Sequence, residues 1–394
     1  MSGAVVVRGP ATQEAWGLVR SMLDDMADMV RTEAQTELEL LEGFRVLGRV
    51  TALCAELSLD VDPEAPWFFS MNTEARLVGG PNPDGEYHLS MIDGTRRYRV
   101  SGQRGTATYL GFQVLAGRGL TPRRMANYVS DYDLALDSDG RFAFVLSQIE
   151  PSVDELQGAE WISIPDDASA IVVRQYVSDR AIEQTAELAI ECIDPVGTPA
   201  IPSDGAIAEQ FTAMAWTIAK LMTLHRTVLP EAVEQPNELF TVEAGALGGE
   251  NTTPDNLYVL GTFRLEPDEA LVVEFTPPDT RYWSVTVENI WHECIDTRRR
   301  RSSVTHSAVS LGSDGTARIV VAAACPPSVV VDHRDGEGEG HRDGEGDGHR
   351  DGEGDGHSVW LDTGGRHRGF VVVRWLDSPA APEVRTTVQP IERS

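Results

Sequence analysis

One stretch, residues 281–292, carries the residue types best suited to chemistry, and it reads RYWSVTVENIWH. A carboxylate and an imidazole held close together can share proton transfer, so Glu288 and His292 are candidates for a general acid and base. His88 is a third candidate, because the otherwise similar later segment has Val259 in its place. The structural alternative is a central strand with aromatic packing and a polar end. The stretch thus favours either a hydrolase or isomerase site or a plain structural strand.

The aromatic residues point to a second kind of site, a pocket for a small organic ligand. Such pockets are mostly apolar and aromatic, with a few polar groups that fix the orientation of the ligand. The predicted ligand-binding residues are Tyr258, Arg281, Trp283, Asn289 and Trp291, with Tyr109 as a further aromatic wall. If the protein is an enzyme, Arg281 or Arg97 would hold an anionic group of the substrate.

Residues 333–356 repeat the octad His-Arg-Asp-Gly-Glu-Gly-(Glu/Asp)-Gly three times. The alternative function of this segment is a metal site formed by His333, His341, His349 and His357. Its spacing matches neither an EF-hand loop nor the calcium-binding nonapeptide repeat. Without apolar residues, the segment cannot offset the entropy lost on ordering. We therefore predict a disordered loop over 332–357 and no metal site.

Four common catalytic and nucleotide-binding motifs are absent from the sequence. There is no G-x-x-x-x-G-K-[ST] phosphate loop, no G-x-G-x-x-G between a strand and a helix, and no G-x-S-x-G nucleophile turn. The zinc motif H-E-x-x-H is interrupted, because Asp296 stands where the second histidine would be. We predict no cofactor.

The composition excludes one class of partner. The 394 residues include 33 Lys and Arg against 62 Asp and Glu, a formal charge of −29. Binding to nucleic acid depends on clustered Lys and Arg that displace counterions from phosphates. The sequence has no such cluster large enough to offset its acidity, so we predict no nucleic-acid partner.

Cysteine usage and the apolar segments predict a cytoplasmic protein. The four cysteines are far apart and form no C-x-x-C pair, which suits a reducing compartment. Residues 1–16 lack the basic and apolar regions of a secretory signal. The densest apolar stretch, 319–325, is far shorter than the roughly 20 residues of a membrane-spanning helix. No oligomeric state follows from the sequence.

An internal repeat predicts two similarly built units. P-D-x-x-Y-x-L at 83–89 recurs at 254–260, 171 residues later. YLGFQV at 109–114 returns as YWSVTV at 282–287, 173 residues later. Repeats of this length indicate a duplicated structural unit. Because a scaffold repeats when a unit is duplicated, the P-D-x-x-Y segments are predicted to be structural, with a fixed turn and a tethered tyrosine hydroxyl.

Apolar periodicity predicts the elements of the first half. Positions three and four apart predict helices over 12–31, with Thr12 as N-cap, and over 35–58. From 67 to 177 the period changes to two, with Asp-Gly turns, as expected of antiparallel strands. A short helix is predicted within 121–129.

The second half repeats that order. Helices are predicted over 179–193 and 203–228, and strands over 238–375. The fold class is therefore α+β, with two duplicated units, each a helical pair followed by an antiparallel β sandwich or barrel-like sheet. The predicted domains are a helical hairpin (1–62), a first β unit (63–177), a second helical pair (178–236) and a second β unit (237–394).

Three segments resemble the family called domain of unknown function 1214 (DUF1214). They are T-P-D-N-x-Y at 253–258, P-D-x-R-Y-W-S at 278–284, and W-L-D-T-G-G-R-x-x-G at 360–369, which leads to Arg374-Trp375. The resemblance covers about 250–376, and the first half is similar to a divergent relative of the partner module, DUF1254. Val359 replaces an asparagine usual in the family. The resemblance implies a β-rich fold and no established reaction.

Three functions follow as hypotheses. The first is binding of a small organic ligand, lipid-like or glycan-like, in an aromatic-lined β pocket. The second is a hydrolase or isomerase that uses Glu288, His292 or His88. The third is a structural part of a larger assembly, for which a broad exposed apolar patch would be the sign.

Overall fold

The computed structural model describes residues 9–118, 121, 123–198, 201–227, 230–242, 253–327, 329 and 358–391. The chain forms two compact units. Unit 1 comprises Met1–Val228, Glu243–Pro254 and Ile290–Glu293, and unit 2 comprises Leu229–Val242, Asp255–Asn289 and Cys294–Ser394. The octad repeat, with its predicted loop and its four histidines, lies outside the described residues.

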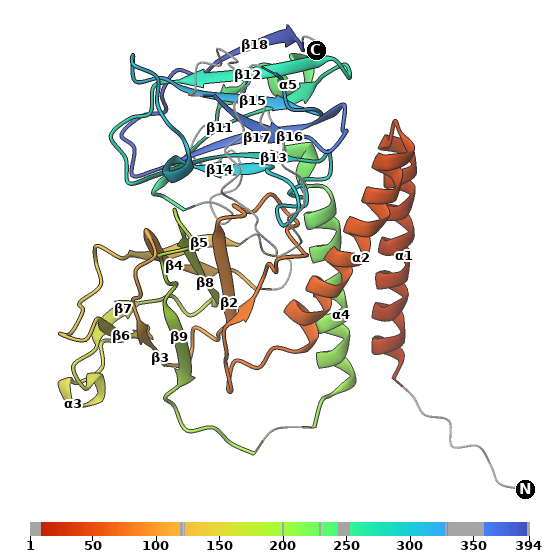
Figure 1. Ribbon diagram of the computed structural model, residues 1–394. Coiled ribbons are helices and arrows are strands. Elements are labelled where there is room, and N and C mark those ends of the chain that lie inside the picture. The colour runs from red at the N-terminus through yellow and green to blue at the C-terminus, as the bar shows by residue number, and fades with distance from the viewer. Residues whose placement is uncertain are drawn as a thin grey trace, which may run out of the picture. The chain divides into compact units, whose positions relative to one another are not determined.

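Unit 1 begins with helices that pack together (Figure 1). They are α1 (Pro10–Glu33), α2 (Glu37–Leu59) and α4 (Asp204–Met222), with a 3-10 turn, η1 (Leu224–Thr227), after α4. α4 contacts both α1 and α2. The buried apolar faces of the three helices form one core that includes Val19, Val50 and Ile218.

α1 starts two residues before the predicted N-cap Thr12, because Pro10 suits the first turn of a helix and another element supplies the cap. The N-cap residue Gly9 has no side chain to cap the helix. Instead, Asp204 at the start of α4 accepts hydrogen bonds from the backbone N–H groups of Ala11 (3.1 Å) and Thr12 (2.9 Å). At the other end Glu33 of α1 bonds to His225 and Arg226, which follow α4. α1 and α4 therefore run parallel.

The β part of unit 1 is a sandwich of two sheets. The five-stranded sheet has the order β1-β2-β8-β4-β5, with β1 (Phe69–Ser70), β2 (Gly85–Met91), β8 (Ala168–Tyr176), β4 (Tyr109–Ala116) and β5 (Arg124–Ser130). The four-stranded sheet has the order β7-β6-β3-β9, with β7 (Glu160–Ser163), β6 (Arg141–Ser147), β3 (Tyr98–Gln103) and β9 (Glu187–Cys192). A short helix, α3 (Val153–Leu156), precedes β7. The inward residues of both sheets form one core, with Phe112, Phe142 and Phe144 packed edge to face or stacked.

Unit 2 repeats this sandwich strand for strand. Its five-stranded sheet has the order β10-β11-β17-β13-β14, with β10 (Phe240–Thr241), β11 (Asn256–Arg264), β17 (Arg368–Leu376), β13 (Tyr282–Glu288) and β14 (Ser303–Thr305). Its four-stranded sheet has the order β16-β15-β12-β18, with β16 (Ser358–Asp362), β15 (Ala317–Ala322), β12 (Glu269–Phe275) and β18 (Arg385–Pro390). Two short helices, α5 (Pro230–Glu234) and η2 (His306–Ala308), also belong to unit 2.

The strand pairing confirms two β units of one design. Within each unit, every named strand pair is antiparallel except one, β6–β7 in unit 1 and β15–β16 in unit 2. The tryptophan in each parallel partner makes the same contact. Trp161 donates its indole N–H to the carbonyl of Ser147 (3.3 Å), and Trp360 donates to that of Ala322 (3.1 Å).

Two predicted helices are wrong. Residues 187–192 form β9, because Leu188, Ile190 and Cys192 alternate toward the sandwich core. The predicted short helix within 121–129 is also a strand, since β5 pairs with the edge of β4. The second helical pair is thus reduced to α4 with short turns after it. The domain boundaries at 62, 177 and 236 stay a prediction.

Candidate functional site

A row of three residues crosses the five-stranded sheet of unit 2. Arg374 on β17 lies between Tyr258 on β11 and Ser284 on β13. The neighbours Trp283 and Val285 point into the sandwich core. Successive strand side chains point to opposite faces, so this row lies on the face turned away from the core, which we call the outer face.

Arg374 is the centre of a buried polar cluster on that outer face. It is 3% exposed, and Glu288 is fully buried. The Arg374 guanidinium donates to Thr286 Oγ1 (3.2 Å) and to Glu288 Oε1 (3.4 Å). The same guanidinium lies 6.0 Å from the ring centre of Tyr258. A buried arginine needs such partners, because an unpaired buried charge is strongly destabilising. We call this cluster the Arg374 site and define it as Tyr258, Ser284, Thr286, Glu288, Ser303 and Arg374.

Hydroxyl groups make up the rest of the Arg374 site. Thr286 Oγ1 and Ser303 Oγ are 3.2 Å apart, which places Ser303 of the edge strand on the same face. Ser284 is fully buried, and its Oγ has no hydrogen-bond partner among the described residues. Buried hydroxyl groups nearly always have a partner. All residues of β13 are buried, so a molecule bound here would be enclosed.

Unit 1 contains the counterpart of this cluster. Arg174 on β8 lies between Tyr87 on β2 and Gly111 on β4. Its guanidinium is again 6.0 Å from the tyrosine ring centre, and it donates to Gln113 Oε1. We call Tyr87, Tyr109, Gly111, Gln113, Tyr128 and Arg174 the Arg174 site.

The predicted aromatic wall is divided between different places. Trp283 packs edge to face on Phe275 inside the unit 2 core, on the opposite side of the sheet from Tyr258. Tyr109 belongs to the Arg174 site, where it stacks on Tyr176 with ring centres 4.9 Å apart. The prediction that these rings face one pocket is therefore wrong for Trp283 and Tyr258.

Trp291 lies in the helical core of unit 1. Its indole N–H donates to the carbonyl of Glu39 (2.9 Å), and its ring packs edge to face with His225 at 5.4 Å. The ring lies directly over Gly43 of α2, where an added Cβ would come within 2.9 Å of it. Gly43 is thus required for close packing, and Trp291 has a structural role.

The next two residues hold the same segment in unit 1. His292 has a left-handed backbone (φ 54°), and its carbonyl accepts a hydrogen bond from Gly80 N–H at 2.8 Å. The Glu293 side chain is 1% exposed and pairs with Arg49 and with Arg45, the latter at 2.8 Å. Glu288 belongs to unit 2, so the two members of the predicted acid-base pair fall in different units.

The other candidates have separate surroundings. His88 lies on β2, opposite Val173, and burial lowers its pKa. Arg281 pairs with Asp377 at 2.6 Å, and Arg97 pairs with Asp194 at 2.7 Å and Glu155 at 2.6 Å. Asn289 is buried directly after β13. Both predicted anion-binding arginines thus already have carboxylate partners.

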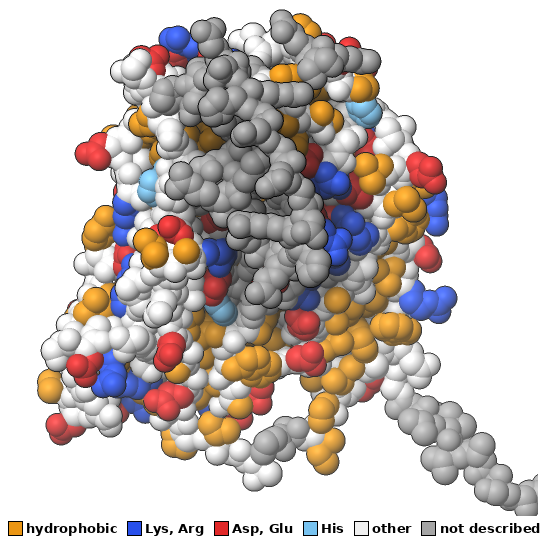
Figure 2. All heavy atoms as spheres, in the orientation of Figure 1, with side chains coloured by type: hydrophobic (Ala, Val, Ile, Leu, Met, Phe, Trp, Pro, Cys, Tyr) orange, Lys and Arg blue, Asp and Glu red, His pale blue; other side chains and the backbone are white. Residues whose placement is uncertain are grey.

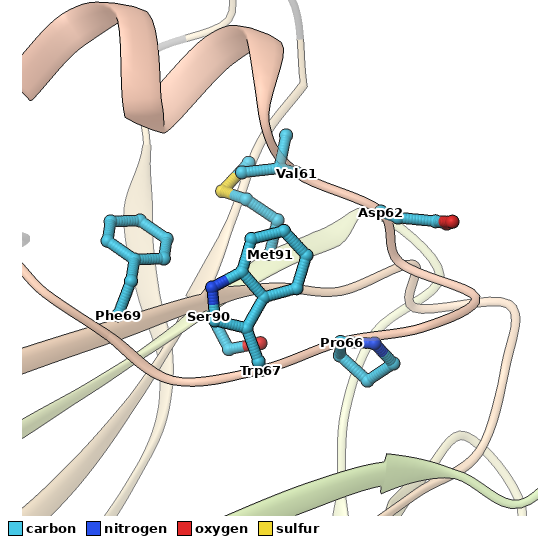
Figure 3. Close-up of a pocket in the computed structure, with 7 residues that line it drawn as sticks. All are labelled: Val61, Asp62, Pro66, Trp67, Phe69, Ser90 and Met91. Atoms are coloured by element: carbon cyan, nitrogen blue, oxygen red, sulfur yellow. The ribbon is translucent and has the colours of Figure 1, made fainter.

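The concave feature in Figure 3 is a shallow depression in unit 1 that contains none of the predicted residues. It is lined by Val61, Asp62, Pro66, Trp67, Phe69, Ser90 and Met91. It encloses about 140 Å³, a value that includes open solvent. Typical ligand pockets measure roughly 300–1,000 Å³, so this depression is too small to be the main site.

Metal and polyanion binding find no support in the described part of the chain. No group of three or more His, Cys, Asp or Glu side chains there is placed to hold a metal ion. On the face in Figure 2, Lys and Arg lie scattered among Asp and Glu and form no broad basic surface. None of the described helices is long and apolar enough to cross a membrane.

The two central arginines, Arg174 and Arg374, were not among the predicted site residues. The available signal was a charged residue inside an apolar strand, IVVRQY at 171–176 and VVVRWL at 371–376. Arginine is almost never fully buried unless it is paired, so a mid-strand arginine predicts a buried partner. Arg374 was noted in the sequence only because it ends the segment that resembles DUF1214.

Comparison with known proteins gives a family match over part of the chain and a structure of similar fold. Residues 263–332 match the family described as protein of unknown function, DUF1214. The match is shorter than the resemblance predicted over 250–376, and it covers β12 to β15, including Ser284, Glu288 and Ser303. Arg374 lies beyond it. None of the curated proteins matches the chain.

One solved structure supports the architecture. An uncharacterised protein from Burkholderia cenocepacia is similar over 98% of this chain and 99% of its own, with 26% identity and a TM-score of 0.84. The VPA0106 protein from Vibrio parahaemolyticus is a more distant match, with 10% identity, 87% and 98% coverage, and a TM-score of 0.46. The likeness to the Burkholderia protein extends to both DUF1214-matched and unmatched parts of the chain.

Proposed function

We propose that this protein binds a small organic ligand at the Arg374 site on the outer face of β11, β17 and β13. The observation that carries the proposal is Ser284, whose buried hydroxyl has no partner among the described residues. Leaving a buried polar group without a hydrogen bond costs about 1–3 kcal/mol. A ligand hydrogen-bonded to Ser284 would remove that cost.

The composition of the Arg374 site suits a ligand with both polar and apolar parts. The Tyr258 ring supplies an aromatic surface, and the hydroxyls of Ser284, Thr286 and Ser303 supply hydrogen-bond donors and acceptors. The charge of Arg374 is balanced by Glu288 at 3.4 Å. A neutral ligand fits this balance better than an anion, which would face Glu288 as well as Arg374.

Ser284→Ala tests the proposal with little change to the fold. The full chain is purified from expressing cells and denatured, and the released small molecules are quantified by mass spectrometry. We expect S284A to retain several-fold less of a compound that the wild type retains. Ser90→Ala is the matched control, because Ser90 is also buried without a partner among the described residues, but on β2 of unit 1. Equal retention by S284A and wild type would refute the proposal.

The strand-for-strand identity of the two units supports a wider family assignment. We extend the DUF1214 relationship beyond 263–332 to the rest of unit 2, and treat the first β unit as a divergent copy resembling DUF1254. The hydrolase or isomerase using Glu288 and His292, the role in an assembly, and the cytoplasmic location stay predictions.

A further inference from the structure

The Arg174 site of unit 1 is filled by two of its own phenol groups. The hydroxyls of Tyr109 and Tyr128 bond to each other directly above Gly111. A Cβ at Gly111 would be 2.6 Å from the Tyr128 oxygen and closer still to that of Tyr109. The row beside Arg174 therefore holds a phenol ring contributed by the edge strand β5.

The Arg374 site has the same register, but none of the described residues places a phenol ring at that register position. Tyr128 pairs with Gln113, and the residue at the same register position in unit 2 is Ser303, paired with Thr286. Ser284 takes the place of Gly111. The stacked ring Tyr176, paired with Tyr109, is replaced by Leu376, paired with Tyr282. Two phenol rings of unit 1 thus correspond to a serine and a leucine in unit 2.

From this difference we infer that the ligand of the Arg374 site is a neutral aromatic alcohol of the phenol type. Its ring would lie where unit 1 places the Tyr128 ring, and its hydroxyl would bond to Ser284 Oγ. The inference rests on the proposed function and adds the ligand class. A hydroxyl group can donate one hydrogen bond and can also accept hydrogen bonds, so it can pair with Ser284 whether the serine hydroxyl donates or accepts.

The apolar surroundings favour an aromatic ring over a sugar. Tyr258 and Tyr282 bring aromatic rings to the outer face, and Leu376 adds an aliphatic surface beside Tyr282. A sugar ring carries hydroxyls around its whole edge. Arg374, Thr286, Glu288 and Ser303 already bond to one another, so a sugar would compete with these bonds or leave several of its hydroxyls without partners. A phenol has one hydroxyl, which matches the single hydroxyl of Ser284.

Ser303→Tyr rebuilds the unit 1 arrangement in unit 2 and is the decisive variant. The probe is 4-methylphenol, titrated into the full chain and followed by calorimetry. We expect the wild type to bind it and S303Y to bind at least tenfold more weakly, because the new phenol occupies the position of the ligand ring. Ser313→Tyr, the matched control, adds the same ring at an exposed serine of unit 2 outside the Arg374 site, and its affinity should stay within about threefold of wild type.

The outcomes separate this inference from the proposed function. Equal affinity of S303Y and wild type for 4-methylphenol would overturn the inference. If S303Y loses the compound that co-purifies with the wild type, but the wild type does not bind 4-methylphenol, the site stands and the ligand class is wrong. Binding of methyl glucoside in place of 4-methylphenol would also overturn the class. Should S303Y fail to fold, S284A gives the same test. We expect S284A to bind 4-methylphenol at least fivefold more weakly than the wild type. Unchanged affinity of S284A would overturn the inference.

Discussion

The outer face of the five-stranded sheet occurs twice in this protein, and the two copies share an arginine but not its neighbours. In each copy a tyrosine and an arginine sit side by side in one register, with the guanidinium 6.0 Å from the ring centre. In unit 1 the arginine meets Gln113 and a cluster of phenols. In unit 2 it meets Glu288 and small hydroxyls. The shared pair belongs to the scaffold, and the two copies differ in the groups that surround the arginine.

The tyrosine of each pair is tethered as a scaffold residue would be. The hydroxyl of Tyr87 accepts a hydrogen bond from Asn82 N–H (2.9 Å), and that of Tyr258 accepts one from Asn256 Nδ2 (3.3 Å). Asn82 precedes β2, and Asn256 is the first residue of β11. The repeated P-D-x-x-Y segment therefore fixes how the strand begins in both units.

The largest expected difference between the units is the effect of removing the arginine. Arg374→Met leaves Glu288 buried without its cationic partner, which costs about 3–5 kcal/mol. Arg174→Met removes a partner of the neutral Gln113, so we expect about 1–3 kcal/mol. Urea unfolding of the full-length variants measures both. Removing the carboxylate as well, in R374M/E288L, should recover most of the loss, and equal effects of R174M and R374M would contradict the comparison.

A second test exchanges the residues opposite the arginines. Gly111→Ser puts a side chain into space held by the phenols of Tyr109 and Tyr128, and overpacking of this kind costs about 1–3 kcal/mol. The reverse change, Ser284→Gly, meets no such obstacle and should cost at most about 1 kcal/mol, the usual penalty for glycine in a strand.

Thermal unfolding of the two single variants and of G111S/Y128S gives the answer. The double variant removes one of the two obstructing phenols, that of Tyr128, and should be more stable than G111S alone. If G111S proves as stable as the wild type, the phenols are not fixed above Gly111.

The two units should also differ in their response to acid. Burial lowers the pKa of His88, so the folded protein resists protonation of His88 more than the unfolded chain does. Below the ordinary histidine pKa of about 6.5, the unfolded chain binds more protons, and stability is lost as the pH falls toward the lowered folded pKa. The loss from His88 is at most about 1.4 kcal/mol per pH unit, and solvent exposure of the ring reduces it.

His88→Val copies Val259 of unit 2 and tests this effect. Melting temperatures of wild type and H88V are compared from pH 7.5 to 5. H88V should lose less stability than the wild type over the acid half of this range. Burial also lowers the pKa of His225, and H88V keeps this residue. The wild type and H88V therefore share the contribution of His225, and the difference between them reports His88.

The smallest effects are expected at the two arginines predicted to hold an anion. The Arg281–Asp377 side chains are 22% and 26% exposed, and those of Arg97 and Asp194 are 34% and 21% exposed. Ion pairs in contact with solvent contribute about 0–1 kcal/mol. Arg281→Ala and Arg97→Ala should each lower stability by less than about 1 kcal/mol in urea unfolding and leave the co-purified compound unchanged. Loss of that compound in R281A would move the ligand site toward Asp377.

Much of the fold followed from local patterns. The helices over 12–31, 35–58 and 203–228 correspond to α1, α2 and α4, because apolar spacing and proline stops are read within one element. β9 was missed because its alternation, in ELAIEC at 187–192, is short and rich in glutamate. Its strand form depends on pairing with β3, where Tyr98 lies opposite Cys192, which is 94 residues later in the chain. No local pattern reports a contact over that distance.

The candidate site was predicted only in part. Strand alternation places Ser284, Thr286 and Glu288 on one face of β13. Tyr258 joins that face only through the pairing of β11 with β17, which the sequence does not show. Trp283 was assigned to the same pocket because aromatic residues suit ligands and cores equally well. The sequence pattern contains no information on which face of β13 the second sheet covers.

The repeat, the strand-rich halves and the turn before each tyrosine were determined by the sequence, since they depend on residue spacing and on proline and glycine geometry. The tertiary structure alone decided which residues surround the arginines and where Trp291 goes. Glu293 pairs with Arg45, 248 residues away, and places Trp291 over Gly43 in the helical core. Burial and charge pairing are properties of contacts between distant segments, so only the folded chain defines them.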